Sequence, residues 1–254
     1  MLSEFKHILV TTGKNIFWLS DSELISLNDS CTISFEDYPK EEGIAMATGL
    51  MIQDRVVVCG GATYDNYTNE CYNIYNGETV FKNFSSMQAV RAGASSLNIQ
   101  GKMWITGGYF ENNGCTNSTE FIDLNSDNSF PPALNIDLPK PTYNHVILNL
   151  NDTTSLLIGG ANVSNPAFPL QETHYFNHLK YTWTDGPNLL YGRYMHTAGV
   201  IKDMGNHKEH IAVVGGRVAP LLFPTQTVEM LLYGQNTWTL GMFVYYLQFG
   251  GKKD

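Results

Sequence analysis

The chain has few charged side chains and no long apolar run. Lys, Arg, Asp and Glu make up 15% of its 254 residues, and the formal net charge is −9. This acidic balance argues against nucleic acid or an anionic membrane surface as a partner. No stretch of 18 consecutive apolar residues occurs, so we expect no transmembrane segment.

Sequence motifs of catalysis and metal binding are also missing. The chain has no His-Glu-x-x-His and no Cys-x-x-Cys, and no Gly-rich loop of the phosphate-binding kind. Two histidines, His145 and His196, recur at matching points of two expected strands. We expect them to make buried structural hydrogen bonds within their repeats. The sequence therefore predicts no catalytic residue, no metal site and no cofactor.

What the chain does contain is a glycine doublet that recurs at the end of short apolar runs. Twenty-three Gly, fourteen Tyr and thirteen Phe also favour strands and tight turns over helices. A period of about 50 residues is typical of a propeller blade made of four strands. The doublets are Gly60-Gly61, Gly107-Gly108, Gly159-Gly160 and Gly215-Gly216.

Each doublet extends into a unit of four expected strands. The first strand precedes the apolar run, and two further strands follow the loop after the glycines. The expected strands are 44–52, 55–59, 70–75 and 79–84; 91–99, 103–106, 120–124 and one near Phe130; 143–150, 155–158, 173–176 and 181–183; and 193–201, 211–214, 227–232 and one at Trp238.

These units resemble the kelch repeat family. The likeness lies in the apolar run with its Gly-Gly, and in the spacing from Phe176 to Trp183 and from Leu231 to Trp238. Arg193-x-x-His196 is similar to the start of the family's first strand, while Phe81 and Phe130 stand where the Trp would be. The resemblance implies an all-β, kelch-type β-propeller with four recognisable four-stranded blades and a partial blade from the termini.

The glycines and tryptophans have physical reasons to recur. The first glycine ends a central strand where neighbouring blades crowd together, and the second is expected to have a positive φ. Trp183 and Trp238 are expected to be largely buried between blades, where an indole removes a large apolar area from water.

The two ends of the chain are less regular. Residues 7–10, 23–27 and 31–35 resemble strands two to four of an additional blade, and 243–251 resembles a strand with a further doublet. This tail either supplies the missing first strand or belongs to an incomplete propeller. We expect a single domain over 5–251, with a polar tail at 252–254.

The four cysteines allow three interpretations. Cys59 ends a second strand and Cys71 begins a third, so the two can face each other across the loop. Cys115 lies in the corresponding loop of the next unit and can pair with Cys71 instead. Alternatively all four cysteines, including Cys31, are reduced, as expected in the cytoplasm.

The compartment is predicted from conflicting features. The chain starts with charged residues where a signal peptide would be apolar, which points to the cytoplasm. The clustered cysteines and the Asn-x-Ser/Thr sequences point to the secretory lumen or the extracellular space, and we favour this second interpretation with a start that lacks its signal. The candidate glycosylation sites are Asn28, Asn66, Asn83, Asn117, Asn151 and Asn162.

The loops after the doublets are the remaining candidates for function. They span 62–69, 109–118, 161–171 and 217–225, and a propeller brings such loops to one face. The resemblance implies a non-catalytic module that binds a protein or glycan partner there. The alternatives are a kelch-propeller enzyme, such as a copper-radical oxidase or a sugar mutarotase, and a truncated non-functional fragment. The candidate contact residues are Tyr64, Tyr109, Phe168 and Arg217.

Overall fold

The protein is all-β in the part of the chain that the structure describes. This computed structural model describes residues 7–12, 21–26, 32–34, 44–52, 55–63, 65–75, 81–110, 114–123, 136–162, 169–202, 208–218 and 223–241. Within these ranges every regular element is a strand. A search of the same ranges for a helix able to span a membrane finds none.

Four antiparallel sheets correspond to the four expected units. In each, the strands neighbour one another in chain order, with the glycine doublet after the second strand. The strands are β4 (Thr48–Ile52), β5 (Arg55–Cys59), β6 (Glu70–Tyr75) and β7 (Lys82–Ser86); β8 (Ser95–Ile99), β9 (Lys102–Thr106) and β12 (Thr119–Asp123); β13 (Val146–Asn151), β14 (Thr154–Ile158), β15 (Thr173–Asn177) and β16 (Thr182–Asp185); and β18 (Thr197–Lys202), β19 (Glu209–Val214), β22 (Val228–Leu232) and β23 (Thr239–Gly241).

The other described strands form three further sheets. The N-terminal sheet has the order β1-β2-β3, in agreement with three of the strands expected there. The fourth strand expected near Phe130 and the strand expected at 243–251 lie outside the described residues. The strands of these further sheets are β1 (His7–Thr12), β2 (Asp21–Ser26), β3 (Thr32–Ser34), β10 (Tyr109–Phe110), β11 (Gly114–Cys115), β17 (Arg193–Tyr194), β20 (Arg217–Val218) and β21 (Phe223–Pro224).

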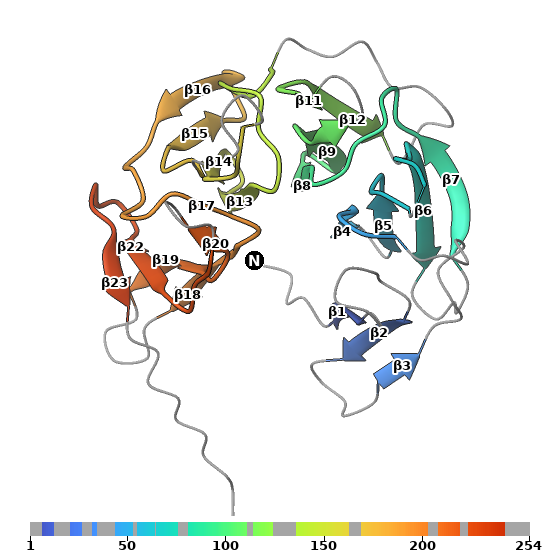
Figure 1. Cartoon of the computed structure of the whole chain (residues 1–254), viewed down its shortest axis with the longest axis horizontal. Coiled ribbons are helices and arrows are strands. Elements are labelled where there is room, and N and C mark those ends of the chain that lie inside the picture. The colour runs from blue at the N-terminus through green and yellow to red at the C-terminus, as the bar shows by residue number, and fades with distance from the viewer. Residues whose placement is uncertain are drawn as a thin grey trace, which may run out of the picture.

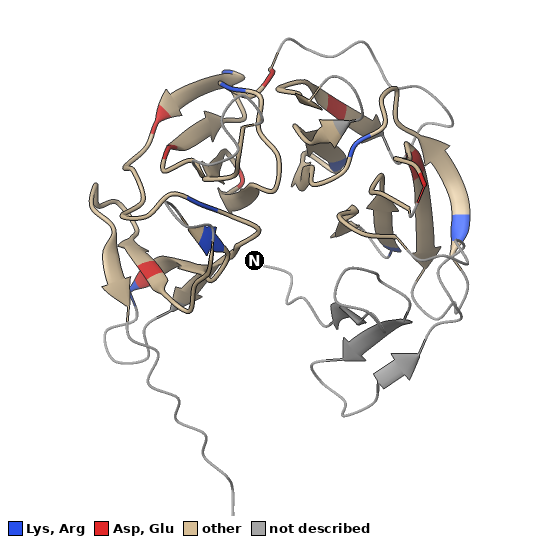
Figure 2. Ribbon diagram, in the orientation of Figure 1, with Lys and Arg blue, Asp and Glu red and all other residues tan. Residues whose placement is uncertain are grey.

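The four larger sheets follow one another around a common centre (Figure 1). Their first strands, β4, β8, β13 and β18, lie nearest the centre, where β4 contacts β8, β8 contacts β13 and β13 contacts β18. Charged side chains are sparse on these sheets (Figure 2). The second strand of each sheet is covered on both faces, which explains why it is a continuous apolar run rather than an alternating one.

The core is divided into apolar clusters between neighbouring sheets. One joins Cys59 and Met87 of the first large sheet to Met103 and Ile105 of the second. Because side chains alternate between the two faces of β14 and β15, these strands pack against both neighbouring sheets. Phe176 packs with Trp104 toward the second sheet, whereas Leu156 packs toward the fourth. Sheet-to-sheet packing of apolar side chains therefore holds the arrangement together.

The two repeat tryptophans differ in burial. Trp238 is only 1% exposed, belongs to the cluster between the third and fourth sheets, and donates a hydrogen bond from Nε1 to the Pro187 carbonyl at 2.8 Å. Trp183 is only half-buried and packs against Phe176, with 4.7 Å between ring centroids. The expectation of burial is confirmed for Trp238 and is wrong in degree for Trp183.

Both glycines of each doublet have positive φ, not only the second. The values are 67° and 104° at Gly60-Gly61 and 62° and 104° at Gly107-Gly108. A Cβ on Gly60 or Gly107 would also lie 2.5 or 2.4 Å from a carbonyl oxygen of the next sheet. Gly215 has no such neighbour, because its Cβ would meet only the Thr225 carbonyl at 3.6 Å.

The expected first strands are each interrupted by one residue in the left-handed region. Met46, Gly93, Asn144 and Met195 have φ of 58°, 63°, 51° and 56°. Backbone hydrogen bonds join these residues from sheet to sheet. The Gly93 amide donates to the Met46 carbonyl, the Asn144 amide to the Gly93 carbonyl and the Met195 amide to the Asn144 carbonyl, at 2.7 to 3.0 Å. At the interruption, the backbone therefore bonds to a neighbouring sheet instead of pairing within its own sheet.

A Cβ at Gly107 is expected to be more destabilising than one at another positive-φ glycine. Gly101 has φ of 78° and nothing within 4 Å of a Cβ, whereas at Gly107 a Cβ would lie 2.4 Å from the Thr142 carbonyl. Gly101→Ala should lower the free energy of unfolding by about 1 kcal/mol, and Gly107→Ala by about 2–4 kcal/mol. Urea denaturation of both variants measures this, and equal midpoints would contradict the crowding.

Candidate binding surface at the glycine ends of the sheets

The segment after each doublet folds back onto the start of its own sheet. In the second sheet Ala92 pairs with Tyr109, and in the third Tyr143 pairs with Ala161. The fourth sheet repeats the pairing in β17 and β20, where Tyr194 is opposite Arg217. Because the same pairing recurs, the loops leave every sheet at the same end.

The doublets tie these ends to one another. The amide of the second glycine donates to a carbonyl of the next sheet: Gly61 to Arg91 at 2.6 Å, Gly108 to Thr142 at 2.9 Å, and Gly160 to Arg193 at 2.8 Å. A side chain at either glycine would prevent this approach. The loop ends are therefore held in fixed positions relative to each other.

A row of four tyrosines crosses these loop ends, which we call the tyrosine row: Tyr67, Tyr109, Tyr143 and Tyr194. Successive ring centroids lie 5.7, 5.7 and 6.5 Å apart, and successive ring planes are inclined by 53°, 54° and 54°. All four side chains are half-buried, so each keeps some exposed surface. The row connects all four large sheets.

In the middle of the row, the Tyr143 hydroxyl lies near the Cys115 thiol. Burial, followed by the neighbouring Tyr194, Cys115 and Tyr109, raises the pKa of Tyr143 above its ordinary value of 10.0. The Tyr143 hydroxyl, like any tyrosine hydroxyl at neutral pH, is protonated and can donate a hydrogen bond. Cys115 lies beside it, with Sγ 3.8 Å from Oδ1 of Asn162.

Two buried ion pairs support the surface from within. Arg91 donates to Oε1 of Glu120 from Nη2 at 2.6 Å and from Nε at 2.9 Å. The Arg91 side chain is 2% exposed and the Glu120 side chain 8%. The same guanidinium donates to the Gly107 and Ser118 carbonyls, and Glu120 accepts from the Gln88 amide. Both the guanidinium and the carboxylate therefore have further hydrogen-bond partners, as a buried ion pair requires.

The fourth sheet repeats this arrangement with Arg193 and Glu229, both fully buried. Arg193 donates to the Gly215 carbonyl, and Glu229 accepts from the amides of Leu190 and Tyr191. Each pair thus fastens the first strand, the doublet and the segment that enters the sheet.

The other two sheets have different residues at the same places. In the first large sheet these are Ile44 and Tyr72, which pack in one apolar cluster. In the third they are Thr142 and His174, and His174 contacts Asp185 instead, with Nδ1 3.1 Å from Oδ1. The ion pair is therefore one of several ways to fill a common position.

His145 and His196 are buried, but the expectation that they make hydrogen bonds within their repeats is wrong: His145 bonds to the preceding sheet, and neither ring nitrogen of His196 has a hydrogen-bond partner among the described residues of its own repeat. His145 lies 3.1 Å from Thr106 Oγ1 on β9 of the preceding sheet. A Cβ at Gly107 would lie 2.9 Å from the His145 ring, and one at Gly159 would lie 3.1 Å from the His196 ring. Each imidazole thus covers the first glycine of the preceding doublet.

These histidines should make stability fall at acidic pH. Burial lowers the pKa of His145 to about 3, and burial followed by the charge of Arg193 lowers that of His196 to about 3. The unfolded state, with an ordinary pKa near 6.5, binds protons first. The stability they contribute is complete above pH 6.5 and is lost as the pH falls toward 3.

The expected slope is about 1.4 kcal/mol per pH unit for each histidine between pH 6 and pH 4. Ala47 and Ala94 stand at the equivalent positions of the first two large sheets, so alanine is the natural replacement. Urea denaturation of the His145→Ala/His196→Ala variant should show a slope shallower by about twice that amount. An unchanged slope would mean that the histidines titrate normally in the folded state.

The structure brings together only some of the predicted contact residues. Tyr109 is in the tyrosine row, and Arg217 is paired with Tyr194 beside it. Tyr64 and Phe168 lie outside the described residues. A search of the described residues finds no group of three or more His, Cys, Asp or Glu that could hold a metal ion.

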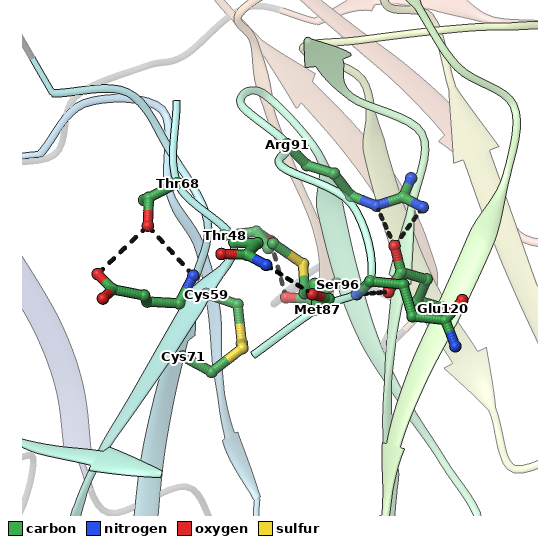
Figure 3. The surroundings of a disulfide bond; sticks show 11 residues. Thr48, Cys59, Thr68, Cys71, Met87, Arg91, Ser96 and Glu120 are labelled. Atoms are coloured by element: carbon green, nitrogen blue, oxygen red, sulfur yellow. Dashed lines mark hydrogen bonds and ion pairs between the residues drawn. A yellow bond between two sulfur atoms is a disulfide. The ribbon is translucent and has the colours of Figure 1, made fainter. Parts of the chain in front are cut away.

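One disulfide joins Cys59 and Cys71, which are opposite each other on β5 and β6 and fully buried (Figure 3). This confirms one of the three interpretations of the cysteines. Pairing of Cys71 with Cys115 is wrong, because Cys71 is already bonded and Cys115 lies beside Asn162. Cys31 lies outside the described residues.

The candidate glycosylation sites differ in accessibility. Asn66, Asn83 and Asn151 are exposed. Asn117 and Asn162 are half-buried; the Asn117 amide donates to the Leu138 carbonyl at 3.4 Å. Asn28 lies outside the described residues. Accessible acceptor side chains are thus present at three of the six positions.

Sequence reasoning missed Tyr67, Tyr143 and Tyr194 as members of a common surface. Tyr143 and Tyr194 precede the first strands and Tyr67 is in a loop, so no single repeat position contains them all. The available signal was the aromatic residue immediately before the first strand in the last two units. A comparison of the chain with protein-family models and with curated proteins finds no match.

Proposed function

We propose that the four large sheets are blades of a kelch-type β-propeller. The support is the recurrence of the same contacts in successive sheets. The second glycine bonds to the next sheet, and the left-handed residue before each first strand bonds to its predecessor. The same contacts between successive sheets are expected of radially repeated blades.

We further propose that the protein is a non-catalytic binding module whose partner, a protein segment, lies across the loop ends. The observation that carries this proposal is the tyrosine row, which crosses all four blades and remains partly exposed. Tyrosine is enriched in binding surfaces because it offers a large rigid ring and a hydroxyl at low entropic cost. A fixed scaffold with aromatic loop ends suits recognition.

Selection from a displayed library of random peptides tests this proposal. Peptides that bind the full chain should lose most of their affinity to Tyr109→Ser, which changes the tyrosine row. They should keep it toward Tyr191→Ser, which alters an exposed tyrosine outside the row. Selected peptides that are insensitive to Tyr109→Ser, or a selection that enriches no binder, would contradict a peptide-binding surface here.

We also propose that the protein acts in an oxidising compartment, outside the cell or in the secretory lumen. The Cys59–Cys71 disulfide and the exposed Asn66, Asn83 and Asn151 support it. Expression behind a signal peptide should give a glycosylated product with this disulfide, which closes a short loop and stabilises by about 2–3 kcal/mol. Mass spectrometry with and without glycosidase checks this; four thiols and no occupied site would favour the cytoplasm.

A further inference from the structure

The tyrosine row has the shape of a series of ridges rather than a flat platform. Neighbouring ring planes meet at 53° to 54°, so the row offers inclined ring surfaces rather than one flat face. A ligand of sugar rings stacks best on coplanar aromatic faces, which this row does not offer. Inclined rings instead suit compact apolar groups that pack against ring edges and faces in turn.

The row also presents hydrogen-bond donors. The hydroxyls of Tyr109, Tyr143 and Tyr194 make no hydrogen bond to the described part of the chain. Tyrosine hydroxyls, with an ordinary pKa of about 10, are protonated at neutral pH and can act as donors. A well-matched ligand therefore combines compact apolar groups with many carbonyl acceptors and few donors of its own.

A proline-rich segment has this chemistry. Proline has no backbone N–H, and in the polyproline II conformation the backbone carbonyls have no internal partner. This conformation rises about 3.1 Å per residue, so each step between tyrosines corresponds to about two residues of ligand. The ligand also loses little entropy on binding, because it is extended beforehand.

We propose that the tyrosine row binds a proline-rich segment of about seven residues in the polyproline II conformation. This inference rests on the proposed peptide-binding function and names its ligand class. The prolines pack against the exposed ring surfaces of Tyr67, Tyr109, Tyr143 and Tyr194. The hydroxyls of Tyr109, Tyr143 and Tyr194 donate to the carbonyls of the ligand.

Fluorescence polarisation with the full chain tests the inference. The probe is a fluorescein-labelled peptide of nine prolines, with a Gly-Ser peptide of equal length as control and unlabelled chitohexaose as competitor. The nine-proline probe should bind saturably, a three-proline probe should bind at least about tenfold more weakly, and the Gly-Ser peptide should not bind. Chitohexaose should not displace the probe.

Variants distinguish the ring from the hydroxyl. Tyr109→Ala and Tyr194→Ala should each weaken binding of the nine-proline probe by about tenfold or more, because an aromatic anchor is lost. Tyr143→Phe keeps the ring and should weaken it by about three- to tenfold through the lost hydrogen bond. Tyr191→Ala, at an exposed tyrosine outside the row, should leave binding unchanged. Circular dichroism spectra that match wild type establish that each variant is folded.

The possible failures have different meanings. If library-selected peptides depend on Tyr109 while the nine-proline probe does not bind, the proline-rich ligand is wrong and the binding module stands. If chitohexaose binds in a Tyr109-dependent manner while neither the probe nor any selected peptide does, the partner is a glycan, and both the proline-rich ligand and the protein-segment partner are wrong. If neither the probe nor any selected peptide binds, both proposals fall. Equal binding of the proline and Gly-Ser peptides also overturns the inference.

Discussion

Replacing Glu120 with Gln is expected to lower the free energy of unfolding by about 3–5 kcal/mol. The substitution keeps the shape of the side chain but removes its charge, which leaves the Arg91 guanidinium buried at 2% exposure without a counter-charge. Arg91 also donates to the Gly107 carbonyl, so the disturbance reaches the glycine doublet. Urea denaturation followed by tryptophan fluorescence measures the loss.

Glu172→Gln is the matched control for this experiment. Glu172 contacts Lys140 at 2.6 Å, the same N–O distance as in the Arg91–Glu120 pair, but the two side chains are 35% and 49% exposed. Water already solvates these charges, so we expect a change of about 0–1 kcal/mol. Equal effects of the two substitutions would contradict the view that burial makes the inner pair important.

Truncation of Trp238 to Ala is expected to destabilise the protein by about 3–5 kcal/mol. The indole is 1% exposed and fills the interface between the third and fourth sheets. Its loss also leaves the Pro187 carbonyl without the hydrogen bond from Nε1. The midpoint of urea denaturation should fall while the dependence on urea concentration stays the same.

Trp183→Ala serves as the comparison, because Trp183 stands at the equivalent repeat position but is half-buried. We expect it to destabilise by about 1–2 kcal/mol, in proportion to the smaller apolar area removed from water. A Trp238→Ala variant that is no less stable than Trp183→Ala would show that the interface does not depend on the buried indole.

The main elements were predictable because their causes are local. The apolar runs, the glycine doublets and the aromatic fourth strands recur at short range, and the structure places a sheet at each described unit. Even so, the prediction assigned positive φ to one glycine of each doublet, whereas both have it. The crowding that restricts the first position of the doublet to glycine comes from the next sheet. The sequence of a single repeat does not reveal it.

The features that were missed depend on contacts between repeats. Met46 and Met195 adopt positive φ because their backbones bond to neighbouring sheets, and nothing in a methionine side chain indicates this. The Arg91–Glu120 pair joins residues 29 positions apart, and Ile44 and Tyr72 replace it in another sheet. A position filled by either charges or apolar side chains has no fixed sequence signature.

The tyrosine row shows the same limitation for the candidate site. Tyr109 was predicted as a contact residue because it follows a doublet, and in the structure it pairs with Ala92 and belongs to the tyrosine row. Tyr143 and Tyr194 reach the same surface from the start of the first strands, on the opposite side of the recurring pairing. Pairing within each sheet and contact between neighbouring sheets are both needed to bring these rings within 6.5 Å of each other.

A crystal structure of the full chain tests the central claim most directly, namely that repeated sheets around one centre carry their loops to a common surface. The account predicts that the amides of Gly61, Gly108 and Gly160 bond to carbonyls of the next sheet, and that the tyrosine row crosses all four sheets at that end. Two sheets stacked face to face, with the tyrosines divided between opposite ends of the molecule, would contradict it.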